Sequence, residues 1–304
     1  MKLPTATLGR TGLKVTRLGF GAMEIRGSRI WGGRPVTEKQ AETILNAVLD
    51  AGVNFIDTAN DYGRSEELIG RYISKRRAEY FIATKCGCTV KHKDENTDDT
   101  PHIWTKENLF RGLHESLARL QTDVIDLMQL HNPSVEDCEK GKLVDAIQEM
   151  RQQGKVRFVG ISTTLPHLPI YLKWGVFDTF QIPYSGLYRE HENAIADSAV
   201  AGIGTIIRGG VQRGEPGAGL GAADKWKIFE EAKLDDLRQP DESRTAFLLR
   251  FTLAHPHIHT TIVGTLYPEH LKENIQTALR GPLPVDVYAE AKRRLAAAGV
   301  SPAG

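Results

Sequence analysis

The sequence predicts an α/β protein folded as a closed (β/α)₈ barrel. Eight short, strand-like runs alternate with longer amphipathic stretches, and 304 residues lie within the usual size of one such barrel. Strands that alternate with helices indicate βαβ units and a parallel sheet. The predicted strands occupy residues 15–20, 54–56, 80–84, 124–130, 156–161, 177–182, 204–207 and 260–263.

An open, doubly wound sheet is the main alternative. It would carry a Gly-x-Gly-x-x-Gly turn after its first strand. Residues 19–24 read Gly-Phe-Gly-Ala-Met-Glu, so the third glycine is missing and the barrel is favoured. No Pro/Ser-rich linker divides the chain. We therefore expect a single domain over residues 1–304, with an N-terminal hairpin, a glycine-rich loop at 209–221 and a C-terminal helical segment at 284–304.

Helical spacing of apolar residues predicts the intervening helices. Ser65 is a candidate N-cap for the first of them, and Gly154 is expected to end a later one. The predicted helices cover residues 65–72, 108–120, 143–153 and 268–279.

Charge and composition exclude several classes of partner. The chain has 39 basic and 38 acidic side chains, a formal charge of +1, so neither a nucleic acid nor an anionic membrane surface is expected to bind. We see no apolar leader and no run of about 20 apolar residues. Three cysteines are too few for a disulfide framework. A reduced, cytoplasmic protein is expected, and the oligomeric state is left open.

Four ionisable residues stand at or just after the ends of successive predicted strands: Asp57, Tyr62, Lys85 and His131. Each of them alone also has a purely structural explanation. Asp57 could be a turn or N-cap residue and Tyr62 a half-buried surface residue. Lys85 could reach solvent or pair with an acid, and His131 could make a structural hydrogen bond. The active residues of a parallel barrel gather at the carboxyl ends of its strands, so together they predict one site. A lysine beside a tyrosine lowers the tyrosine pKa, an aspartate holds the lysine, and a histidine can donate to a carbonyl oxygen. Carbonyl reduction needs such a set.

With these residues, the chain resembles the aldo-keto reductase superfamily over almost its whole length. The matching segments are residues 8–15, 18–23, 55–59, 62–66, 83–85 and 126–131. The resemblance implies the barrel fold and nicotinamide-dependent reduction of an aldehyde or ketone to an alcohol. The aromatic residues Trp31 and Trp104 favour a sugar-like carbonyl. The resemblance also implies that the cofactor supplies hydride and that Tyr62 supplies the proton. By the same resemblance Lys85 tunes Tyr62, Asp57 supports Lys85, and His131 orients the substrate carbonyl.

The same resemblance implies a cofactor site without a Rossmann unit. Ser162 matches the first residue of a Ser-Asn pair, but Thr163 stands in place of the asparagine. Gly264 and His270 occupy positions where NADPH-preferring members usually carry a cation. The resemblance therefore implies only a slight preference for NADP(H) over NAD(H). The implied cofactor-binding residues are Gly21, Ala22, Met23, Asp57, Ser162, Gln181, Arg208, Gly209, Gly210, Val211, Gly264, Thr265, His270, Glu273 and Asn274.

Trp31 and Trp104 are candidates for a substrate wall, with simple packing as the alternative. Residues 86–88 read Cys-Gly-Cys, with His92 and His102 nearby, but this spacing does not match a zinc motif, and we predict no metal. Whether Cys86 is reactive is left open. The alternative function is a redox-silent, cofactor-binding scaffold that regulates a partner, since the family contains channel-associated β subunits.

Overall fold

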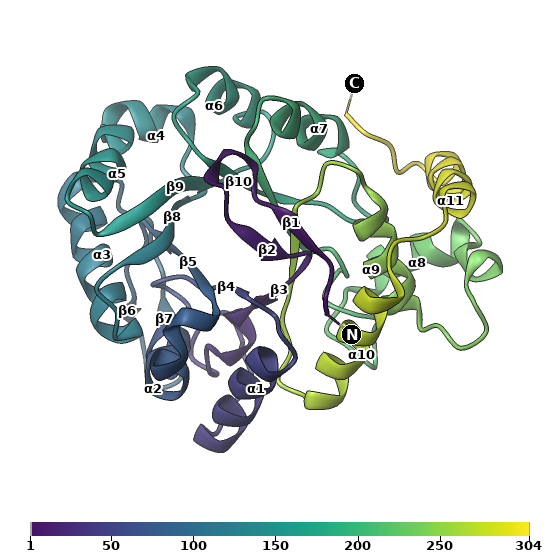
Figure 1. The fold of residues 1–304 in the computed structure, drawn as a ribbon, viewed down its shortest axis with the longest axis horizontal. Coiled ribbons are helices and arrows are strands. Elements are labelled where there is room, and N and C mark those ends of the chain that lie inside the picture. The colour runs from purple at the N-terminus through teal and green to yellow at the C-terminus, as the bar shows by residue number, and fades with distance from the viewer. Residues whose placement is uncertain (1, 304) are drawn as a thin grey trace. The chain divides into compact units, whose positions relative to one another are not determined.

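The computed structural model describes residues 2–303, and its eight parallel strands form a closed barrel (Figure 1). The strand order around the barrel is β10-β11-β12-β3-β4-β5-β8-β9. The predicted fold class is confirmed. By its internal contacts the chain separates into two compact units, described in turn: Gly19–Phe180 with Gly264–Leu271, and Met1–Leu18 with Gln181–Val263 and Lys272–Gly304. The single domain over residues 1–304 stays a prediction.

In the first unit, helices follow the strands in the predicted alternation. Helix α3 packs against β5, α5 packs against β9, and the neighbouring helix pairs α1–α2, α2–α3 and α3–α5 contact each other (Figure 1). The elements of this unit are β3 (Leu18–Gly21), α1 (Glu38–Asp50), β4 (Phe55–Asp57), α2 (Ser65–Ile73), β5 (Phe81–Cys86), β6 (Lys91–His92), β7 (Asp98–Asp99), α3 (Lys106–Leu120), β8 (Ile125–His131), α4 (Val135–Lys140), α5 (Leu143–Gln152), β9 (Val156–Ser162) and α6 (Leu168–Trp174).

The register of this ladder brings polar residues to one edge of the sheet. Asp57 of β4 pairs with Ala83 of β5, and Lys85, two residues further along β5, pairs with Gln129 of β8. His131, at the end of β8, pairs with Ser162. All seven residues of β8 are buried, as expected for a parallel strand covered on both faces. The carboxyl ends of β4, β5, β8 and β9 therefore carry polar side chains, and most of the other residues in these strands are buried.

In the second unit, β1 (Thr5–Thr7) and β2 (Lys14–Thr16) form the predicted N-terminal hairpin, and β11 (Gly204–Arg208) pairs in parallel with β12 (Thr260–Val263). The amide of Arg10 donates to the carbonyl of Gly202. Gly9 has a φ of +48°, and a Cβ there would lie 2.3 Å from the backbone of Gly204, so this turn requires glycine. The remaining elements lie wholly or mostly in this unit: β10 (Thr179–Pro183), α7 (Glu192–Val200), α8 (Ala223–Glu231), α9 (Arg244–Ala254), α10 (Pro268–Arg280) and α11 (Val285–Ala297).

The predicted glycine-rich loop is found between β11 and α8, and the predicted C-terminal helix is α11. Helix α9 is buried at every position from Ala246 to Leu253, so it is an internal rather than an amphipathic helix.

Two local predictions are wrong. The run 15–20 is not one strand, because β2 and β3 are separate elements on either side of Arg17, whose amide donates to the carbonyl of Pro4. Ser65 is not the N-cap of α2 but its first residue, and the N-cap is Arg64. The Ser65 hydroxyl instead donates to the carbonyl of Ala22 at 2.9 Å, so it links the start of α2 to the residues that follow β3.

Candidate active site

A buried ion pair lies at the centre of the predicted site. Nζ of Lys85 is 2.6 Å from Oδ1 of Asp57, and the two side chains are 1% and 2% exposed. Nζ also donates to the carbonyl oxygen of Thr58 at 2.8 Å. The second carboxylate oxygen, Oδ2, accepts from Nε2 of Gln129 at 3.1 Å. Both charges are thus paired and hydrogen-bonded, which compensates their removal from water.

Tyr62 lies against this pair from the turn after β4. Nζ of Lys85 is 3.4 Å from the Tyr62 hydroxyl and 4.9 Å from the centre of its ring. The amide of Tyr62 donates to the carbonyl of Ala59, and the Tyr62 carbonyl accepts from the amide of Ser65 at the start of α2. The backbone on both sides of Tyr62 is therefore fixed, and its hydroxyl is held within reach of the ammonium.

The pKa values of this group are shifted by burial and by the neighbouring charges. Burial is the largest influence on Tyr62 and raises its pKa. Lys85 acts in the opposite, predicted direction, but Asp57 and Asp61 add to the upward shift, so the pKa of Tyr62 is raised overall. Burial alone would lower the pKa of Lys85, yet Asp57 and Tyr62 outweigh it and raise that pKa. Lys85 is therefore an ammonium and Tyr62 a neutral phenol at neutral pH.

His131 stands beside Tyr62 at the end of β8. The two rings meet edge to face with their centres 5.9 Å apart. Nδ1 of His131 lies 3.2 Å from Sγ of Cys88, and 3.3 Å from Oδ1 of Asp61 without the geometry of a hydrogen bond. The structure thus brings together all four residues predicted to act in catalysis.

The two tryptophans approach the site from opposite loops. Trp31, which is 50% exposed, meets Tyr62 edge to face with ring centres 5.8 Å apart. Trp104 stacks on His102, and the His102 ring centre is 6.0 Å from that of His131. A Cβ at Gly87 would lie 1.9 Å from the Trp104 ring, so only glycine permits this approach.

Several residues of the implied cofactor site also lie together in the first unit. A Cβ at Gly264 would lie 2.3 Å from the carbonyl oxygen of Gly21, so these two backbones are in direct contact. Ala22 and Met23 begin the short 3-10 helix η2 (Ala22–Ile25) that follows. The hydroxyl of Thr265 accepts from the amide of Tyr267, next to the start of α10. The exposed backbone of Gly264 leaves room for a ligand to approach closely. His270, also in this unit, is half-buried, and its ring lies edge to face with that of Tyr267 at 5.3 Å.

Sequence reasoning missed Asn132. It follows His131 with a φ of +62°, and its Oδ1 accepts a hydrogen bond from the Ser162 hydroxyl at 2.8 Å. Ser162 therefore has an amide neighbour in space, although its chain neighbour is Thr163. The Asn132-Pro133 sequence after His131 was a weak signal, because asparagine tolerates left-handed backbone.

Sequence reasoning also missed Arg34. Its guanidinium lies over the Tyr267 ring at 5.3 Å and is 2.9 Å from a carboxylate oxygen of Glu24. Nε of Arg34 is buried, and no described residue hydrogen-bonds to it. Arg34 therefore places a cation beside Tyr267, which lies between Gly264 and His270 in the chain. These are the two positions at which NADPH-preferring relatives were expected to carry a cation and this sequence does not.

In the second unit, Gln181 is buried in β10 and Arg208 ends β11. Gly209 has a φ of +75°, and the carbonyl of Gly210 accepts from the Thr252 hydroxyl at 2.8 Å. A Cβ at Gly210 would lie 2.5 Å from Oγ1 of Thr261, so this backbone is closely packed. The other three implied residues are Val211, which is buried, Glu273, which accepts from the Ser243 hydroxyl at 2.5 Å, and Asn274, which is 8% exposed.

Cys86 does not line the site. It is fully buried in β5, its thiol faces the carbonyl of Gln129 at 3.7 Å, and burial raises its pKa to about 12. A thiol with so high a pKa is a poor nucleophile at neutral pH. Cys88, two residues further on, is the cysteine that reaches His131.

Comparison with known proteins gives a consistent result. The model of the aldo/keto reductase family matches residues 17–214. An uncharacterised oxidoreductase of Bacillus subtilis, YqkF, is 29% identical over 89% of this chain and 90% of its own length. The L-galactose dehydrogenase of Arabidopsis thaliana is 26% identical over 90% of this chain and 88% of its own.

Among solved structures, the holo form of an aldo-keto reductase from Bacillus halodurans superposes with a TM-score of 0.83. It is 27% identical, and the match covers 98% of each chain. Within residues 2–303, no helix is both long and apolar enough to cross a bilayer.

Proposed function

This chain belongs to the aldo/keto reductase family, whose members are NAD(P)H-dependent oxidoreductases, and we propose that it reduces an aldehyde or ketone to an alcohol with Tyr62 as the proton donor. The observation that carries this proposal is the contact of the Tyr62 hydroxyl with a lysine that is itself paired to a buried aspartate. A tyrosine without a charged neighbour would be too weak an acid to protonate the substrate at neutral pH. The neighbouring ammonium makes proton donation favourable because it stabilises the phenolate that is left.

The role of Lys85 follows from charge. When the phenol gives its proton to the developing alkoxide of the substrate, a phenolate forms beside the Lys85 ammonium. The attraction between these two charges in a buried site stabilises the product of proton transfer. Asp57 keeps Lys85 protonated and at a fixed position, because its carboxylate lies 2.6 Å from Nζ. Asp57 is a positioning residue in this scheme.

His131 is suited to orient the carbonyl. Its ring stands edge-on to Tyr62, so a substrate oxygen that meets the Tyr62 hydroxyl also comes near the imidazole. A second donor at that oxygen stabilises its growing negative charge and fixes its direction. Tyr62 and His131 then act on one substrate oxygen from different sides, and Lys85 acts through Tyr62.

The residues fit a nicotinamide cofactor, which supplies hydride when bound. The Gly21 and Gly264 backbones in contact provide a surface without side chains, suited to a phosphate. The Ser162–Asn132 pair offers a hydroxyl and an amide for a carboxamide group, the role that the missing asparagine at position 163 would otherwise have. The buried, unbonded Nε of Arg34 offers a donor for an anion, which supports the slight preference for NADP(H) over NAD(H).

A sugar-like carbonyl is the substrate class that the surroundings favour. The exposed face of Trp31 lies next to Tyr62, and a ring of this kind packs well against the apolar face of a sugar. The similarity to a plant L-galactose dehydrogenase supports the same class.

The proposed reductase activity is tested by measuring carbonyl-dependent oxidation of the reduced cofactor. The protein is mixed with NADPH or NADH and a panel of aldoses, ketoses and simple aldehydes, and loss of the absorbance of the reduced nicotinamide is followed. Oxidation of the cofactor that depends on the carbonyl is expected. Tight cofactor binding without turnover on any carbonyl would instead favour the redox-silent regulatory scaffold.

A further inference from the structure

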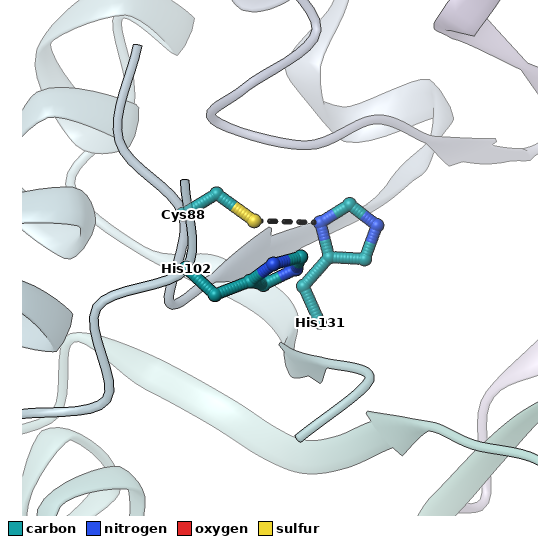
Figure 2. Close-up of side chains that lie close together, drawn as sticks. All are labelled: Cys88, His102 and His131. Carbon is teal, nitrogen blue, oxygen red and sulfur yellow. Dashed lines mark hydrogen bonds between the residues drawn. The ribbon is translucent and has the colours of Figure 1, made fainter. Parts of the chain in front are cut away.

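Three side chains that can bind a metal meet beside the candidate active site. They are Cys88, His102 and His131, and their ligand atoms all lie within 4.8 Å of one another. Figure 2 shows the Cys88 sulfur directed at the His131 ring, with the His102 ring next to both. Sγ of Cys88 and Nδ1 of His131 are 3.2 Å apart.

Asp61 adds a second, independent observation. It is 1% exposed, and its carboxylate interacts with Cys88 and His131, although its Oδ1 makes no hydrogen bond of regular geometry to a described residue. That oxygen is directed at the same cluster, since it lies 3.3 Å from Nδ1 of His131. A buried carboxylate oxygen without a hydrogen bond of regular geometry is costly unless a cation or a water compensates it.

The spacing is close to that of a zinc site. In tetrahedral zinc centres the Zn–S distance is about 2.3 Å and the Zn–N distance about 2.0–2.1 Å, which puts the sulfur and nitrogen ligands about 3.5 Å from each other. The 3.2 Å between Cys88 and His131 is within a few tenths of an ångström of that value. We propose that Cys88, His102 and His131 bind Zn²⁺, with Oδ1 of Asp61 as the fourth ligand.

Neighbouring contacts hold two of these ligands in place. Cys88 forms an isolated antiparallel bridge with His102, so their backbones are adjacent although 14 residues separate them. The Cys88 carbonyl accepts from Nδ2 of Asn60 at 3.0 Å, and the His102 ring stacks on Trp104 at 5.1 Å. His102 is exposed, so an ion has a route from solvent to the buried ligands.

The ligand set selects the kind of ion. A thiolate with two imidazoles favours Zn²⁺ over Mg²⁺ or Ca²⁺, which prefer sites built only of oxygen ligands. On binding, the Cys88 S–H bond breaks, an S–Zn bond forms and the proton leaves to solvent. His131 is shared with the proposed reductase site, so an ion bound there withdraws this imidazole from the carbonyl. Zinc bound at this site should therefore inhibit carbonyl reduction, a consequence that rests on the proposed reductase function.

The site can be tested without cofactor or carbonyl. The full chain, freed of metal with a chelator, is titrated with Zn²⁺ against a chromophoric chelator, and with Co²⁺ in a spectrophotometer. We expect one saturable site and a thiolate-to-cobalt charge-transfer band. Cys88→Ser should remove the band and weaken Zn²⁺ binding by at least about 100-fold, and His102→Ala should weaken it similarly. The absence of one-to-one binding, or a band that survives in Cys88→Ser, would overturn the proposal.

Cys86→Ser and His92→Ala are the matched controls. Both residues are near in sequence, but Cys86 faces Gln129 and His92 pairs with Asp98 on the β6–β7 hairpin, so neither change should alter metal binding. His102→Ala is a second ligand variant that should fold normally, because the His102 side chain is exposed. Weaker metal binding in this variant would therefore not be caused by misfolding. In the reductase assay, Zn²⁺ should reduce turnover of the wild type in parallel with binding. Full activity of a zinc-saturated enzyme would contradict the sharing of His131.

Discussion

Nζ of Lys85 lies 2.6 Å from Oδ1 of Asp57, and both side chains are almost wholly enclosed by protein. A buried pair of this kind adds little to stability compared with an apolar pair, but it is costly to break on one side only. The Lys85 ammonium lies 3.4 Å from the Tyr62 hydroxyl, which is where the proposed mechanism forms a phenolate.

Replacement of Lys85 by methionine should destabilise the protein and abolish reduction. Lys85→Met leaves the Asp57 carboxylate buried without its partner, and we expect a loss of about 3–5 kcal/mol in urea unfolding. Lys39→Met is the control, because Lys39 pairs with Glu42 on the surface and is 82% exposed. Equal stability of Lys85→Met and Lys39→Met would show that the buried pair is not needed.

The reduction rate should be flat across neutral pH and fall only in strong alkali. Burial holds the pKa of Tyr62 above its usual value near 10, so the phenol keeps its proton until about pH 10 or higher. The acid form is the active one, hence activity declines as the pH rises through that pKa. The measurement is kcat/KM for a carbonyl at saturating reduced cofactor. A decline centred below about pH 8 would assign the proton to another group.

Removal of Arg34 should weaken NADPH binding selectively. In the proposed cofactor site the Arg34 guanidinium beside Tyr267 pairs with the 2′-phosphate, so Arg34→Ala should raise the Kd for NADPH about tenfold and leave that for NADH nearly unchanged. Glu24→Gln is the matched variant, because Glu24 competes for Arg34 at 2.9 Å and its neutralisation should tighten NADPH. Equal effects on both cofactors would remove Arg34 from this role.

His255 should make the protein less stable in weak acid. It is buried, its Nδ1 accepts from the amide of His257, and burial lowers its pKa to about 4. The unfolded chain, with a pKa near 6.5, takes up a proton first as the pH falls, so stability declines between about pH 6.5 and 4. His255→Gln should flatten this decline by about 2–3 kcal/mol.

Urea unfolding at a series of pH values measures this slope. The exposed His114 provides the control, since His114→Gln should leave the slope as in the wild type. A His255→Gln variant that keeps the full decline would mean that other groups cause it.

The fold and most of the catalytic residues could be predicted because they depend on short sequence patterns. Alternating strands and helices identify the barrel, and Asp57, Lys85 and His131 could be assigned to one edge because the carboxyl ends of neighbouring parallel strands meet there. The Tyr62 pKa was predicted only in part. The effect of Lys85 follows from its charge, but the burial that outweighs it depends on packing.

What the sequence did not predict depends on loops. Asn132 meets Ser162 only because its backbone takes a positive φ, and Arg34 reaches Tyr267 from a segment 233 residues earlier in the chain. The proposed metal-ligand set of Cys88, His102 and His131 was not predicted either. The spacing drew attention to residues 86–88, His92 and His102 but not to His131. Cys88 faces His131 because β5 ends at Cys86 and Gly87 turns the chain with a φ of +112°.

The most direct test of the account is the Tyr62→Phe variant, compared with the wild type in cofactor binding and in turnover. The change removes one hydroxyl and keeps the ring that meets Trp31 and His131. We expect kcat for carbonyl reduction to fall by about 10²–10⁴-fold while the Kd for NADPH, measured by fluorescence titration, stays within about twofold. A variant that retains most of its kcat would contradict Tyr62 as the proton donor.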